Sequence, residues 1–307
     1  MIVTIGTTPA LARSMVFHGL VTGDVNRAAS VHVNAAGKAV NVARVAVMLG
    51  EKVKSVGFAG GKSGDELVGD MKRMGIKTFY HRVQSPTRVC VTVIDEKGRT
   101  TTELVEEAGP VSSFDLILLR LRALEAAVNC GVVVCSGSLA PGVSPSEMRQ
   151  IVHEVQQHGR RKVAIIDASG PMLSQFFGDP DCVLKCNAKE FWGTFSPDDV
   201  LGKTGNLLNK TDMLGIVITD GTEPTRVFDR SGGYVIRTPK VKVVSPIGSG
   251  DAVAAGLAVG LSRKLPFPDA VRLGVACGAA NAQTRIAGEV DPIEVQRLFE
   301  SILIHRL

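Results

Sequence analysis

The chain has 307 residues, of which 45% are hydrophobic and 21% charged, a balance typical of a globular protein with a large core. Its net charge of +5 is spread without a Lys/Arg block, and only 5% of residues are aromatic, so we expect no nucleic-acid partner. No apolar stretch approaches the roughly 20 residues of a membrane span, and MIVTIG is typical of a strand rather than a signal peptide. The six cysteines form no CxxC pair, which favours reduced thiols over disulfides or zinc. We therefore expect a cytoplasmic protein without a membrane partner.

Short β-branched runs alternate with longer amphipathic stretches along most of the chain. In chain order they predict a strand at 1–5, a helix at 38–50, a strand at 52–60, a helix at 63–75, a strand at 130–138, a helix at 144–159, strands at 161–169, 183–187 and 214–221, a helix that follows Asp251, and a final helix near 267–284. This alternation indicates an α/β fold with a mostly parallel central sheet covered by helices on both faces.

Two segments, approximately 12–34 and 82–107, show period-two alternation instead, and the sequence DEKG in the second is typical of a hairpin turn. We interpret them as a small antiparallel β-lid inserted into one domain that spans residues 1–307, because no linker divides the chain. An exposed edge of such a lid sheet suggests a homodimer formed through the lids.

The stretch GFAGGKS at 57–63 is similar to a phosphate-binding P-loop. That loop needs four residues between its glycines, and here there are three, which argues against it.

The stretch NAAGKAVNVAR at 34–44 is a candidate ligand site. Gly37 allows a close approach of the backbone, and Lys38 and Asn41 share one face of the next helix. An ammonium group at a helix N-terminus favours an anion. A solvated lysine and a capping asparagine remain an equal alternative.

The stretch SPIGSGDAVAAG at 245–256 is a second candidate. Gly248 and Gly250 leave consecutive backbone N–H groups free to bind an anion, and Asp251 follows them at once. A carboxylate beside bound phosphate is repulsive unless it acts as a base, and that combination suits phosphoryl transfer. An ordinary helix-initiating aspartate remains the alternative.

Together these two stretches resemble the two signatures of the ribokinase-like (PfkB) carbohydrate kinase family. The branch that includes 1-phosphofructokinase and tagatose-6-phosphate kinase is similar in further landmarks, which are TTPALAR, DVNRAASV, PTRVCVTV, TTELVEEAGP, CSGSLAPGV, IIDASG and LKCNAKE. The resemblance implies a ribokinase-like fold and a kinase that uses ATP and Mg²⁺ to phosphorylate a hydroxyl of a sugar phosphate of the fructose 1-phosphate or tagatose 6-phosphate type.

The resemblance also implies roles for individual residues. Asp251 would be the general base, beside an anion hole formed by Gly248, Ser249 and Gly250. On the substrate side it implies roles for Gly37, Lys38, Asn41, Arg88 and Ser138, with Lys38 and Arg88 on the substrate phosphate and Asn41 on the sugar hydroxyls. On the nucleotide side it implies Lys185, Thr219 and Gly221 beside the triphosphate, Asn281 beside the adenine, and Asn187 and Glu190 on Mg²⁺, through water.

The chain departs from the family pattern mainly on the sugar side. Ala12 stands where the branch usually has a sugar-binding aspartate and Thr8 where it has an asparagine, while Asn34, Ala36 and Ala39 replace an acidic residue and two glycines. On the nucleotide side Cys186 replaces a proline and Pro224 a glycine. These departures leave the acceptor's identity open.

Three alternatives stay open from the sequence. One is a kinase of an unphosphorylated sugar or nucleoside, in which Lys38 and Arg88 would face a neutral acceptor. Another is a non-catalytic sensor of sugar phosphates or nucleotides. A nicotinamide-dependent oxidoreductase is disfavoured because no GxGxxG follows the first strand.

Overall fold

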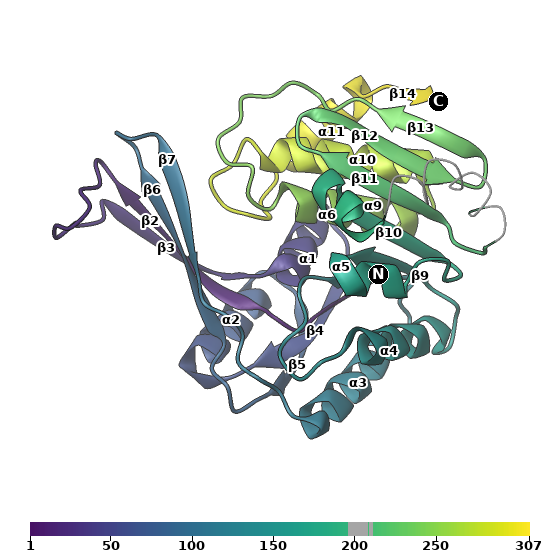
Figure 1. Cartoon of the computed structure of the whole chain (residues 1–307), viewed down its shortest axis with the longest axis horizontal. Helices are drawn as coiled ribbons and strands as arrows, with labels where there is room; N and C mark the ends of the chain where they lie inside the picture. Colours follow the sequence, from purple (N-terminus) through teal and green to yellow (C-terminus); the bar gives the residue numbers. More distant parts are fainter. Residues whose placement is uncertain (196–207, 209–210) are drawn as a thin grey trace.

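A computed structural model describes residues 1–195, 208 and 211–307 (Figure 1). In these residues the main sheet has ten strands, in the order β14 (Ile304–Arg306), β13 (Gly232–Ile236), β12 (Glu223–Asp229), β11 (Gly215–Asp220), β10 (Cys182–Asn187), β9 (Val163–Asp167), β8 (Val132–Ser136), β1 (Ile2–Gly6), β4 (Val53–Ala59) and β5 (Lys77–Arg82). The strands from β11 to β5 pair in parallel, whereas β12, β13 and β14 are antiparallel additions. The prediction of a mostly parallel α/β sheet is therefore confirmed.

Helices cover both faces of this sheet and enclose a separate hydrophobic core on each face. One core lies under α1 (Lys38–Met48), α2 (Gly61–Arg73), α9 (Ser249–Ser262), α10 (Phe267–Asn281) and α11 (Pro292–Ser301). The other core lies under α3 (Ser113–Ala127), α4 (Pro145–Gln157), α5 (Gly170–Gln175) and α6 (Ala188–Thr194). Among the described residues, none of these helices is long and apolar enough to cross a membrane.

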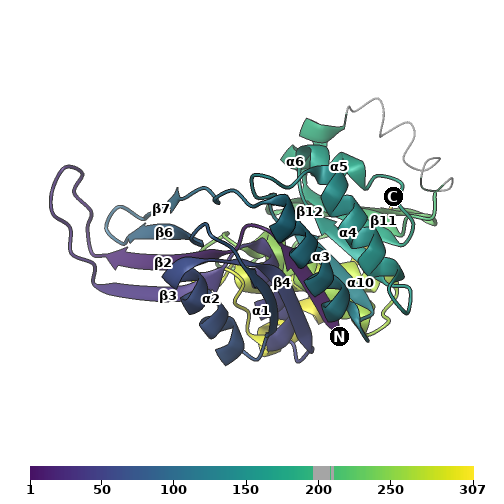
Figure 2. The same cartoon turned by 90° about the horizontal axis from the view of Figure 1, so that it is seen from below.

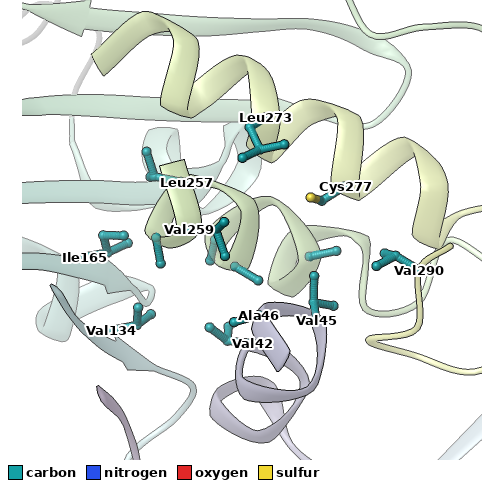
Figure 3. Close-up of a cluster of buried hydrophobic side chains, with 14 of the residues drawn as sticks. Val42, Val45, Ala46, Val134, Ile165, Leu257, Val259, Leu273, Cys277 and Val290 are labelled. Atoms are coloured by element: carbon teal, nitrogen blue, oxygen red, sulfur yellow. The ribbon is translucent and has the colours of Figure 1, made fainter. Parts of the chain in front are cut away.

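Helix α9 is buried on every side, which explains the unbroken run of small residues after Asp251. A Cβ atom on Gly256 would lie 2.7 Å from the Cys277 sulfur, and one on Gly260 would lie 2.6 Å from the Ala270 Cα atom. Small residues therefore let α9 and α10 pack backbone against backbone. Figure 3 shows α9 between α10, the N-terminal helix α1 and the strands of the sheet.

A second, four-stranded sheet, here called the small sheet, projects from one side of the molecule (Figures 1 and 2). Its order is β3 (Ser30–Ala36), β2 (Ala10–Phe17), β6 (Arg88–Asp95) and β7 (Thr100–Val105), and DEKG forms the β6–β7 turn. The predicted antiparallel pairing holds for β3 with β2 and for β6 with β7, whereas β2 and β6 pair in parallel, contrary to the expectation. The reason is topological: β2 continues from β1 and β6 from β5, and these two strands run in the same direction in the main sheet.

The segment bounds also differ from those expected. Arg82 ends β5 of the main sheet, and the small sheet begins at Ala10 rather than Ala12. Elements that the sequence analysis did not predict are β5, α3, α5, α6, β12, β13, β14 and α11, so the helix near 267–284 is not the final one.

Candidate active site

The carboxyl ends of the parallel strands open into a cavity of about 1180 Å³, bounded by the small sheet and by the starts of α1 and α9. This volume exceeds the roughly 300–1,000 Å³ of a typical site for one small ligand, so it has room for two. Thirteen of the fifteen predicted site residues line it: Gly37, Lys38, Asn41, Arg88, Lys185, Asn187, Glu190, Thr219, Gly221, Gly248, Ser249, Gly250 and Asp251. The cavity therefore joins residues that lie more than 200 positions apart in the chain.

The start of α9 depends on a left-handed glycine. Gly248 caps the helix with φ of 81°, and a Cβ atom there would lie 2.8 Å from both the Ala287 Cβ and the Gly288 nitrogen. Gly248, Ser249 and Gly250 all line the cavity, and the Ser249 N–H donates to the Pro246 carbonyl at 3.2 Å. The N-terminus of α9, with its helix dipole, therefore borders the cavity and favours an anion there.

Asp251 lies in the first turn of α9, with only 7% of the residue exposed. Its Oδ2 atom accepts a hydrogen bond of 2.8 Å from Asn41 Nδ2 on α1. Burial, followed by the charge of Asp167, raises the pKa of Asp251 to about 6, against the opposing effects of Asn41, Lys185 and Lys38. A carboxyl group with this pKa is ionised at neutral pH and still basic enough to accept a proton.

Two lysines lie close to this carboxyl group. A Cβ atom on Gly250 would lie only 3.0 Å from Lys185 Nζ, so that ammonium group is in contact with the start of α9. Lys185 in turn forms a buried ion pair of 2.9 Å with Asp167. The charge of Asp167 also raises the pKa of Lys38, against the opposing effect of burial, and keeps Lys38 cationic.

Sequence analysis gave Asp167 no role. It is fully buried at the end of β9, where Ser136 Oγ donates to it at 2.8 Å. Burial by itself would raise the pKa of Asp167, but Lys185, Lys38 and the hydrogen bonds bring it below its usual value. A carboxylate that ends a buried parallel strand, in the landmark IIDASG, was the signal that could have identified it.

Asn187 and Glu190 form a capping box at the start of α6, with hydrogen bonds of 2.8 and 2.9 Å. That alone is ordinary helix capping. The second carboxylate oxygen of Glu190, however, lies 3.7 Å from Lys38 Nζ, so this ion pair links the predicted nucleotide and substrate sides.

This arrangement also fits a magnesium ion held largely through water. Glu190 Oε1 has no hydrogen-bond partner among the described residues besides that long ion pair. Mg²⁺ prefers one or two carboxylate oxygens together with waters and substrate phosphates. Within the described part of the chain, no three His, Cys, Asp or Glu side chains cluster as a metal cage.

Arg88 and Ser138 meet at Thr8. Arg88 Nη2 donates to the Thr8 carbonyl at 3.0 Å, and the Thr8 and Ser138 hydroxyls lie 3.0 Å apart. Arg88 lines the cavity, whereas the exposed Ser138 does not. Arg88 Nε is buried without a hydrogen-bond partner in the described residues.

On the nucleotide side, Thr219 is the penultimate residue of β11, and Gly221 follows the strand in the turn with φ of 57°. Asn281 differs from the expectation, because it is fully buried and does not line the cavity. Its amide donates to the Ile247 carbonyl at 2.9 Å and accepts from the Gly288 N–H at 2.8 Å, so it braces the loop that leads into α9. Small neighbours on α10, Gly278 and Ala279, face the cavity instead.

The comparison with known proteins agrees with this arrangement. The sequence model of the pfkB family carbohydrate kinases matches residues 1–294. The structure is similar to phosphofructokinase-2 from Escherichia coli in complex with potassium, with a TM-score of 0.88, 23% identity and 98% of each chain covered. A possible 1-phosphofructokinase from Thermotoga maritima gives a TM-score of 0.87 at 22% identity, with 100% of this chain and 99% of that one covered. Ribokinase from the same organism gives 0.74 at 17% identity, with 98% and 99% covered. At such identities the structural likeness establishes a shared ribokinase-like fold.

Proposed function

The chain belongs to the pfkB family of carbohydrate kinases and is an ATP-dependent sugar kinase, and we propose that its acceptor is a sugar phosphate of the fructose 1-phosphate or tagatose 6-phosphate type. The observation that carries the proposal is the buried carboxylate of Asp251 at the N-terminus of α9, beside Lys185 and Lys38. A base, anion-binding amides and cations in one cavity are the parts that phosphoryl transfer requires.

In the proposed reaction, Asp251 accepts the proton of an acceptor hydroxyl. The hydroxyl oxygen forms a bond to the γ-phosphorus while the bond from that phosphorus to the β–γ bridging oxygen breaks, and ADP leaves with the electron pair. The backbone N–H groups of Gly248, Ser249 and Gly250 stabilise the charge on the transferring group. Lys185, Thr219 and Gly221 flank the triphosphate.

Lys38 and Arg88 bind the phosphate that the acceptor already carries. Lys38 contacts Glu190 only at 3.7 Å, and Arg88 Nε is buried without a hydrogen-bond partner in the described residues. An acceptor phosphate would satisfy both cations better than a neutral sugar, which argues against an unphosphorylated acceptor. Phosphofructokinase-2 from E. coli has been solved in complex with fructose-6-phosphate, and the fold of this chain is similar to it. Asn41, in addition to its contact with Asp251, is proposed to reach the sugar hydroxyls, with Ser138 close behind Arg88.

Magnesium would be held by Glu190 and Asn187, mainly through water, and would offset the charge of the ATP phosphates. Lys38 exchanges its ion pair with Glu190 for the acceptor phosphate, so Glu190 is released for this role as the acceptor binds.

We also propose that residues 1–307 form one kinase domain, with the small sheet as a lid that excludes water during transfer. Exclusion matters because water in the same position would hydrolyse ATP. The opposite face of the small sheet exposes Val31, Val33 and Leu104, and we propose that two chains form a homodimer there.

An ADP-release assay with Mg-ATP tests the function. Fructose 1-phosphate, fructose 6-phosphate and tagatose 6-phosphate should give higher kcat/KM than free fructose, tagatose, ribose or nucleosides. Arg88→Met should raise KM for the phosphorylated acceptors at least about tenfold, because one charge-assisted contact is lost.

The alternatives give different outcomes in the same assay. A preference for unphosphorylated acceptors, unaltered by Arg88→Met, would overturn the assignment of the two cations. Binding of sugar phosphates without ADP release from any acceptor would instead indicate a sensor.

A further inference from the structure

The cavity-facing side of the small sheet is organised in rows. Side chains alternate along each strand, so every second residue of β2, β3, β6 and β7 faces the cavity. The residues of this inner face are Ala10, Ala12, Ser14, Asn34, Ala36, Arg88, Cys90, Thr92, Glu103 and Val105. Strand register aligns them across the sheet.

Three of the four residues in the middle row of this inner face offer no strong hydrogen-bond acceptor. Ala12 pairs in register with Asn34 on one side and with Cys90 on the other, and Cys90 pairs with Val105. A methyl, a thiol and an isopropyl group therefore lie side by side. The thiol is a weak hydrogen-bonding group, and burial raises the pKa of Cys90, which keeps it neutral. The fourth residue, Asn34, lies on β3 beyond Ala12; its Nδ2 donates to the Ala35 carbonyl at 2.9 Å, so its Oδ1 is the strong side-chain acceptor of this row.

The row farther from the main sheet is polar, and the row nearer to it combines Arg88 with Ala10 and Ala36. Arg88 lies in register with Ala10, one row nearer the main sheet, and Ser14, Thr92 and Glu103 form the row beyond. Successive rows are about 7 Å apart along a strand, which is close to the width of a sugar. An acceptor whose phosphate contacts Arg88 can therefore rest its carbon skeleton against the middle row.

We propose that the acceptor is a deoxy-sugar phosphate, a phosphorylated sugar that lacks a hydroxyl on the part facing Ala12, Cys90 and Val105. This inference rests on the proposed function and narrows its substrate class. A hydroxyl pressed against these three side chains loses its water partners and gains no replacement, whereas a CH₂ group loses nothing there.

The test compares matched acceptors in the ADP-release assay. Fructose 6-phosphate and tagatose 6-phosphate differ only at C4, so both are compared with the same 4-deoxy compound. Each is also compared with its own 3-deoxy form. Ribose 5-phosphate is compared with 2-deoxyribose 5-phosphate. The wild-type enzyme should favour the deoxy member of at least one pair by about tenfold or more in kcat/KM, the discrimination typical of an apolar wall against an added hydroxyl.

Ala12→Asp supplies the missing acceptor and should lower the deoxy preference at least about tenfold, mainly by improving kcat/KM for the hydroxylated member. Cys90→Ser, which is nearly isosteric, should shift the ratio in the same direction by less. Ile293→Asp adds the same charge on α11, where the side chain is 80% exposed and outside the cavity, and should leave the ratio unchanged. Thermal unfolding of each variant verifies that it folds.

The outcomes separate the two levels of the proposal. A wild-type preference for every hydroxylated member, or a ratio that Ala12→Asp and Cys90→Ser leave unchanged, overturns the inference while kinase activity stands. If no acceptor gives ADP, the proposed function fails. Calorimetric Kd values for the same acceptor pairs then test the inference. Tighter binding of the deoxy member that Ala12→Asp abolishes supports the inference, and any other result overturns it.

Discussion

Asp251 combines two properties that oppose each other. Its burial at the start of α9 makes the carboxyl group basic enough to accept a proton, and the same burial makes its ionised form costly to the folded protein. The hydrogen bond from Asn41 and the nearby charges of Lys185 and Lys38 offset this cost. The Oδ1 atom of Asn41 is itself buried without a partner in the described residues. The geometry is therefore that of a site selected for reactivity at the expense of stability.

Asp251→Asn should stabilise the protein at pH 8. The folded-state pKa of Asp251, about 6, lies above the ordinary value of 3.8. The free energy of unfolding that the neutral carboxyl group contributes is therefore fully present below pH 3.8 and is lost as the pH rises through 6. Asparagine stays neutral throughout and can also donate to Asn41. The expected gain in unfolding free energy is about 2–3 kcal/mol at pH 8 and smaller at pH 5.

Urea unfolding at the two pH values measures this difference, with Asp24→Asn, in an exposed loop, as the control. A gain that is absent at pH 8, or equal at both pH values, would contradict the proposed burial of an ionised Asp251.

At the scale of single residues, the sequence predicted most of the candidate site. A helix start next to a glycine restricts where the side chains of its first turn can point. On this basis the sequence predicted four residues that line the cavity: Lys38, Asn41, Gly248 and Asp251. Asn281 was not placed correctly, since its position on α10 does not reveal that its amide turns inward to Ile247 and Gly288. The ion pair between Asp167 and Lys185 was also missed. It joins β9 and β10, and no local sequence pattern specifies that these two strands are neighbours in the sheet.

At the scale of elements, periodicity predicted the strands and helices whose burial is one-sided or complete. It failed for α3, where apolar residues occur on the exposed side as well: Phe114, Ile117 and Leu121 are all more than half exposed. Such a helix has no clear polar face to reveal its period. It also failed for the direction of β2 relative to β6, because alternation specifies which face a side chain occupies but not the direction of the neighbouring strand.

The element that matters most for function is the small sheet. Its two central strands extend directly from β1 and β5, so a movement of the small sheet would carry Ala12 and Arg88 together toward or away from Asp251. The departures from the family pattern that the sequence analysis noted at Ala12, Asn34 and Ala36 all lie on its inner face. Changes in substrate could thus accumulate on one element while the proposed catalytic residues on α1 and α9 stay fixed.

At the scale of the whole molecule, the active site depends on contacts between distant segments. Lys38 on α1 contacts Glu190 on α6, and Asn41 contacts Asp251, so the N-terminal, central and C-terminal parts of the chain meet in one cavity. The phosphofructokinase-2 from E. coli has also been solved in a tetrameric inhibited form, so assembly is a property of at least one protein of similar fold.

The proposed homodimer through the outer face of the small sheet gives a direct prediction. Val33→Glu combined with Leu104→Glu should convert a dimer to a monomer in light scattering coupled to size exclusion, because the charges would be buried against the partner. Ile293→Glu on α11, which is 80% exposed, is the matched control and should leave the mass unchanged. A wild-type monomer, or a double variant that remains dimeric, would refute this interface.

The central claim is that Asp251 takes the proton of the acceptor hydroxyl, and the turnover of Asp251→Asn with the best acceptor tests it most directly. We expect kcat to fall at least ~100-fold while the variant folds normally, and kcat/KM of the wild type to rise with pH through about 6 and level off above it. A folded Asp251→Asn enzyme with wild-type turnover would contradict the account.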